Sequence, residues 1–159
     1  MRSRPRPPRR VRAVPGALAA VVLLGAAGCG TAVDVPPAED ATAPGCASVL
    51  VLLREVTELA GLPRVEATGQ STAAWASDDR ATQVVLRCGV ALPAPTTDLC
   101  LTVDGVDWVT ADEEASPPWT TYGRAPATEV DVVGDVAAAD VLPGLAGAVG
   151  ALPAQRACV

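Results

Sequence analysis

Apolar residues recur at helical spacing in two stretches of the chain, near residue 50 and near the C-terminus. Ser48 is placed to cap the first stretch and Gly61 to end it, which predicts a helix over residues 49–60. Asp140 is placed to cap the second, and Pro143 falls in its first turn, where a missing N–H does little harm. The apolar positions are Val49, Leu52, Leu53, Val56, Leu59 and Ala60 in the first helix, and Val141, Leu145, Val149 and Leu152 in the second.

Between these stretches apolar and polar residues alternate, as they do in strands with one buried face. Asp104 and Gly105 give a hairpin-turn signal within this region. The order helix, strands, helix predicts an α+β fold, in which an antiparallel meander of four to five strands carries both helices on one face. The predicted strands cover residues 84–90, 99–103, 106–109, 119–124 and 127–133.

The N-terminal pattern is different. Six arginines in the first dozen residues precede an apolar run over residues 17–27 and then Cys29. This arrangement predicts a bacterial lipoprotein signal peptide over residues 1–28, with Cys29 as the lipid-bearing residue of the mature protein. A membrane-spanning helix needs about 20 apolar residues, so the run is too short to be an uncleaved span. We therefore expect a lipid-anchored protein on the extracytoplasmic face of the cell membrane.

Residues 29–45 contain three prolines and several carboxylates but few apolar residues. This composition predicts a disordered acidic tether between the anchor and the folded part. At about 3.3 Å per residue such a tether would hold the domain well away from the membrane. Residues 46–159 are then expected to form a single domain.

Charge and composition exclude several classes of function. Without residues 1–28 the chain keeps six arginines against eighteen carboxylates, a net charge of −12, so it lacks the basic face that nucleic acids require. Lysine and histidine are absent, which removes the usual general base, Schiff-base amine and imidazole metal ligand. We therefore predict no catalytic residues, no cofactor and no metal site.

Four cysteines remain once Cys29 carries lipid: Cys46, Cys88, Cys100 and Cys158. An exported chain meets an oxidising compartment, so we expect two disulfides. Of the three possible connectivities we favour Cys46–Cys158 and Cys88–Cys100, although Cys88 and Cys100 alternate onto opposite faces of their strands. In the loop-entropy model such bonds stabilise the fold by about 3 to 5 kcal/mol each.

A few side chains are candidates for ligand binding. Tyr122 and Arg124 flank Gly123, and a guanidinium binds carboxylate or phosphate through two hydrogen bonds, so these residues predict a site for an anionic metabolite. Trp108 and Trp119 are candidate walls of the same site. The alternative is that Arg124 pairs with one of the carboxylates and that the tryptophans fill a core lacking phenylalanine and isoleucine.

Three short stretches resemble a family of exported lipoproteins from high-GC Gram-positive bacteria that is known only as a domain of unknown function. They lie at residues 85–90, 106–109 and 120–130, and the likeness covers the chain from about Cys46 to its end. The resemblance implies an exported protein of the cell envelope and implies no catalytic residues.

The predicted function is therefore a non-enzymatic binding or accessory domain of the cell envelope, with the membrane and an envelope protein or cell-wall component as partners. A small-ligand domain that uses Tyr122 and Arg124 is the alternative. A hydrolase working through paired carboxylates is the least supported, because no spacing of acidic residues suggests such a pair.

Overall fold

The computed structural model describes residues 32–111 and 118–158. The predicted signal peptide and Cys29 lie outside these residues. The described part contains two α-helices, one short 3-10 helix and eight strands. In chain order they are α1 (Pro44–Leu52), η1 (Leu53–Glu55), β1 (Glu58–Leu59), β2 (Leu62–Val65), β3 (Thr72–Ala76), β4 (Gln83–Val90), β5 (Leu99–Val103), β6 (Val106–Thr110), β7 (Trp119–Thr121), β8 (Ala127–Val133) and α2 (Ala138–Val149).

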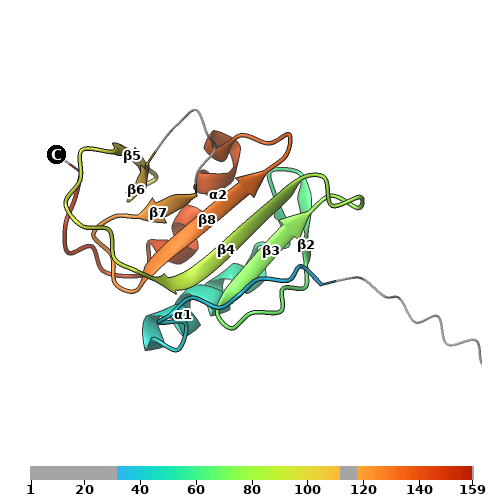
Figure 1. Ribbon diagram of the computed structural model, residues 1–159, viewed down its shortest axis with the longest axis horizontal. Helices are drawn as coiled ribbons and strands as arrows, with labels where there is room; N and C mark the ends of the chain where they lie inside the picture. The colour runs from blue at the N-terminus through green and yellow to red at the C-terminus, as the bar shows by residue number, and fades with distance from the viewer. Residues whose placement is uncertain (1–31, 112–117, 159) are drawn as a thin grey trace, which may run out of the picture.

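All eight strands form one antiparallel sheet in the order β1-β2-β3-β4-β8-β7-β6-β5 (Figure 1). The first four strands and the last four strands each form a meander, and the two meanders join where β4 pairs with β8. The predicted meander of four to five strands was therefore wrong in strand number and in topology, although the fold is α+β. The difference comes from β1, β2 and β3, which the alternation of the sequence does not mark.

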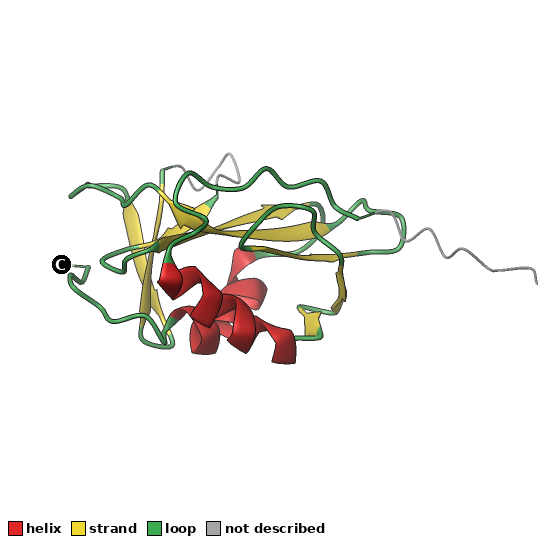
Figure 2. Ribbon diagram, turned by 90° about the horizontal axis from the view of Figure 1, so that it is seen from below, coloured by secondary structure: helices red, strands yellow, loops and turns green. Residues whose placement is uncertain are grey.

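Both helices lie on the same side of the sheet (Figure 2). The core between helices and sheet contains two fully buried indoles, Trp75 of β3 and Trp108 of β6. Alternate residues of β4 explain this layering, because Val84, Leu86 and Cys88 are buried while the intervening residues are partly exposed. The other large side chains that are fully buried are Val49, Leu53, Val106, Val130, Val141, Leu142, Leu145 and Val149.

Both helices differ from their predicted bounds. The first begins at Pro44, which needs no N–H in the first turn, and its last turn tightens into η1. Ser48 is therefore an exposed residue inside α1 rather than its cap. Gly61 follows Ala60 in the β1–β2 turn, where both residues have positive φ. The second helix begins at Ala138, with no side-chain cap.

The opposite face of the sheet is covered by residues 33–41, which the sequence predicted to be a disordered tether. Figure 2 shows this segment running along the sheet on the side away from the helices. The N–H of Val33 donates to the carbonyl of Glu66 at 2.8 Å, and the N–H of Asp40 donates to the carbonyl of Gly89 at 2.9 Å. Val35 is only 4% exposed. The tether prediction is therefore wrong from residue 32 onward: this segment is part of the fold.

The two disulfides connect Cys46 to Cys88 and Cys100 to Cys158. The predicted number is correct, but the predicted pairing was wrong. Cys88 faces the helix layer, where α1 places Cys46 above it. Cys100 pairs across the strands with Val109 and points to the other face, where the C-terminal segment brings Cys158. Both bonds therefore respect the alternation of side chains along a strand.

Candidate binding site

A groove of about 520 Å³ lies between the loop that leads into β5 and the C-terminal segment. It is at the end of the molecule where the C-terminus lies, and the first described residues of the N-terminal segment lie toward the opposite end (Figures 1 and 2). One disulfide, Cys100–Cys158, forms part of its wall. The lining residues are Thr96, Thr97, Asp98, Leu99, Cys100, Val109, Tyr122, Ala157 and Cys158.

The C-terminal wall of the groove is held in place by hydrogen bonds that its backbone N–H groups donate. The N–H of Gln155 donates to the carbonyl of Gly123 at 2.7 Å, and the N–H of Cys158 donates to Oδ2 of Asp107 at 2.8 Å. Gly123 has a φ of +71°, and a Cβ there would lie 2.0 Å from the carbonyl oxygen of Arg156. Only glycine therefore allows the C-terminal segment to lie this close to the end of β7.

The groove combines an aromatic ring with polar groups. The guanidinium carbon of Arg156 lies 5.8 Å from the centroid of the Tyr122 ring, a cation–π distance that keeps this ring in place. On the other wall the hydroxyl of Thr96 accepts a hydrogen bond from the N–H of Asp98 at 3.1 Å. The Asp98 side chain is exposed at the mouth of the groove. This chemistry suits hydrogen bonding to a partner.

Arg124 is not part of the groove. Its guanidinium is buried, with 8% of the residue exposed, and donates to the carbonyls of Gly105 at 2.8 Å, Gly150 at 3.2 Å and Leu152. Two of these carbonyls follow the end of α2, where a positive charge is favourable. Because its donors serve the backbone, Arg124 is a structural residue. The structure therefore does not support an anion site built on Arg124.

The candidate tryptophans are also placed elsewhere. Trp108 faces the helices and is fully buried, and Trp119 is partly buried against the same core. Of the predicted ligand-binding residues, only Tyr122 lines the groove. The structure thus adds Thr96, Thr97 and Asp98 to the candidate site. A strand that starts at Leu99 predicts a loop before it, but nothing in the sequence indicates which loop meets the C-terminus.

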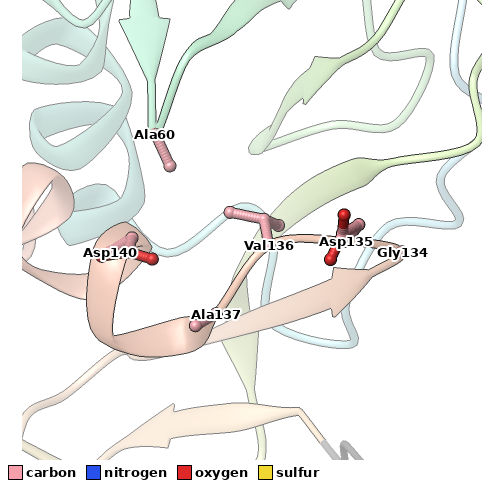
Figure 3. Close-up of a pocket in the computed structure, with 6 residues that line it drawn as sticks. All are labelled: Ala60, Gly134, Asp135, Val136, Ala137 and Asp140. Carbon is pink, nitrogen blue, oxygen red and sulfur yellow. The ribbon is translucent and has the colours of Figure 1, made fainter.

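A second, more open depression lies where β8 leads into α2, and its volume is about 770 Å³ (Figure 3). Its two carboxylates, Asp135 and Asp140, lie on opposite sides of the depression with Val136 between them. In the parts of the chain that the structure describes, no three carboxylate, cysteine or histidine side chains come together as metal ligands do. No helix in those parts is long and apolar enough to cross a membrane.

The structure defines a disulfide-linked α+β domain that is built on an eight-stranded antiparallel sheet and has a groove at the end where the C-terminus lies. A protein-family model described as "Protein of unknown function (DUF3515)" matches residues 11–157, and the chain belongs to this family. No curated protein and no solved structure matches the chain.

Proposed function

We propose that this protein is a membrane-anchored lipoprotein of the cell envelope, whose domain binds another envelope component at the end that carries the groove. The observation on which this depends is the arrangement of the two ends. The described chain begins at residue 32 toward one end of the molecule, and β5, whose residues Leu99 and Cys100 line the groove, lies at the other end (Figure 1). An anchor at Cys29 would therefore direct the groove away from the membrane.

The length of chain before the fold strengthens this proposal. Val33 already pairs with Ala67 next to β2. Cys29 precedes Val33 by four positions, so its Cα lies at most about 15 Å from that of Val33, since one residue spans at most about 3.8 Å. A lipid on Cys29 would hold this end of the domain against the membrane surface. The other end would project into the envelope.

The disulfides are consistent with export, because such bonds form and persist in oxidising compartments. A binding role fits a groove that is bounded by hydroxyl groups, a carboxylate and an aromatic ring. Binding sites usually combine a few polar groups of this kind with apolar walls. The proposed protein is a binding or accessory domain and not an enzyme.

Intact-mass measurement of the native protein tests the anchor. We expect a chain that begins at Cys29 and carries diacylglycerol, whose two acyl chains are enough for stable attachment. Cys29→Ser should abolish this mass and the membrane association, whereas Thr31→Ser, a matched control close to the processing site, should change neither. A native protein with an unmodified N-terminus in the soluble fraction would contradict the anchor.

Site-specific photo-crosslinking in intact cells tests the binding end. A photoreactive amino acid at Thr97, in the groove, should give a discrete adduct with an envelope component. The same amino acid at Asp135, in the depression of Figure 3, serves as the control. Equal adduct patterns at the two positions, or none at Thr97, would refute the assignment of this end as the binding surface.

A further inference from the structure

The two edges of the sheet are very different. One edge is β1, which is only two residues long and is followed on β2 by Pro63. The other edge is β5, with five residues from Leu99 to Val103. Short strands and prolines are common devices that stop an edge from pairing with other chains. The β1 edge has them and the β5 edge does not.

The β5 edge is uncharged and apolar on one face. Its five residues contain neither proline nor a charged side chain. Leu101 is 41% exposed, and Leu99 and Val103 share its face because they alternate along the strand. Among the described residues only β6 pairs with β5, so the outer backbone groups of β5 have no strand partner there. Such an edge is a template for one more strand.

The residues that flank β5 oppose pairing with a second copy of this chain. Asp98 precedes the strand and Asp104 follows it, and both are exposed. Two antiparallel copies that pair all five residues centre on Leu101, and this register brings Asp98 of each copy to the end of the strand pair where the other copy has Asp104, in its β5–β6 turn. Like charges that face each other across a pair of strands are destabilising. Pairing of β5 with β5 of a second copy is therefore disfavoured, whereas pairing with a strand that has a positive charge at each end is not.

We propose that the β5 edge binds an extended segment of a partner protein, which adds to the sheet as a further antiparallel strand. The segment has alternating apolar residues that pack beside Leu101, and a basic residue at each end that faces Asp98 or Asp104. The groove borders the same strand, since Leu99 and Cys100 line it. This inference specifies the partner of the proposed binding function, and it does not depend on the lipid anchor.

A pair of peptides tests the charge complementarity. Both are as long as the span from Asp98 to Asp104 and alternate threonine and valine, one with a lysine at each end and the other with a glutamate at each end. Fluorescence anisotropy with the purified full chain should show binding of the lysine peptide and at least about tenfold weaker binding of the glutamate peptide. The double variant Asp98→Lys/Asp104→Lys should reverse this preference.

The matched control is Asp78→Lys/Asp135→Lys, which changes the net charge equally at exposed positions outside β5. It should keep the preference for the lysine peptide. If the double variant at Asp98 and Asp104 binds both peptides as the unaltered protein does, or if no peptide binds, the proposal is overturned. The proposal of a lipid anchor would be unaffected, because the intact-mass measurement tests it independently.

The protection against self-pairing gives a second test. In the antiparallel pair centred on Leu101, Asp98→Lys alone brings a lysine at position 98 of each copy near Asp104 of the other copy. Both ends of the strand pair then have opposite charges facing each other. This variant should dimerise at least about tenfold more tightly than the unaltered protein in sedimentation velocity, and Asp135→Lys should not. If the unaltered protein already dimerises and Leu101→Lys abolishes that dimer, then a second copy occupies the edge and the proposal is wrong.

Discussion

Replacement of the buried Arg124 is the most direct test of how this end of the molecule is held together. Its guanidinium connects three parts of the chain: the β5–β6 turn at Gly105, and the residues Gly150 and Leu152 that follow α2. Arg124→Met keeps much of the aliphatic side chain but removes every donor. Three buried or half-buried carbonyls then lose their side-chain partner.

The expected loss follows from those three carbonyls. Leaving one buried acceptor unsatisfied costs about 1 to 3 kcal/mol. Part of this cost is offset because the guanidinium no longer has to be desolvated, and water can reach the outermost carbonyl. We therefore expect the free energy of unfolding to fall by about 3 to 5 kcal/mol, as when one partner of a buried charged network is removed.

Urea denaturation of the disulfide-intact protein measures this loss. At a typical slope of about 2 kcal/mol per molar, the midpoint should fall by about 1.5 to 2.5 M without a change in slope. The matched control is Arg87→Met, which removes a partly exposed ion pair with Glu129 and should cost about 1 kcal/mol or less. A loss of under about 1 kcal/mol for Arg124→Met would refute the structural role assigned to Arg124.

Three further outcomes follow from single contacts. Gly123→Ala should destabilise the C-terminal segment far more than Gly105→Ala, because a Cβ at Gly123 meets the Arg156 carbonyl while one at Gly105 meets nothing within 4 Å; proteolysis of the C-terminus reports the difference. Under graded reductant, mass spectrometry should detect alkylation of the half-buried Cys100 and Cys158 before that of the fully buried pair joining α1 to β4. Hydrogen bonds from a serine hydroxyl and a backbone N–H lower the pKa of Asp79. The stability that this carboxylate contributes is therefore complete above the ordinary carboxyl pKa and is lost as the pH falls through the lowered pKa. An NMR titration that gives an ordinary pKa for the Asp79 carboxyl would contradict this prediction.

Strands with one buried face were predictable from the sequence. In β4 the buried residues alternate with partly exposed ones, and the hairpin between β5 and β6 turns at Asp104 and Gly105, both with positive φ. These elements follow local rules of periodicity and turn chemistry. Their bounds match the predicted strands closely, with β4 over Gln83–Val90 and β5 over Leu99–Val103.

The strand β3 was missed because it is buried on both faces. Trp75 faces the helices, while Thr72, Ala74 and Ala76 face the opposite side of the sheet, and all five residues of the strand are buried. A strand covered on both sides shows no alternation of polar and apolar residues. Its recognition requires knowledge of what covers the second face, and that information lies some thirty residues earlier in the chain.

The candidate site depends on long-range contacts that local patterns do not encode. Tyr122 could be selected from the sequence, because an aromatic residue beside Gly123 is unusual in this chain. The loop residues Thr96 and Asp98 have no distinctive spacing, and they become part of a site only because the disulfide at Cys100 draws the C-terminal segment across the strands. The pairing of the cysteines was thus the decisive missing fact.

The N-terminal segment explains small residues that would otherwise be attributed only to a chain composition rich in alanine and glycine. A Cβ at Gly69 would lie 2.1 Å from the carbonyl oxygen of Val35, and one at Gly89 would lie 2.3 Å from the carbonyl carbon of Asp40. The small outward residues of β3 leave space for the same segment. The fold is therefore shaped to hold residues 33–41. If Cys29 carries lipid, only four positions separate the anchor from Val33, which pairs with Ala67 beside the sheet. This short connection would limit how far the domain can move from the membrane, and with it the height at which a partner's extended segment can reach the β5 edge.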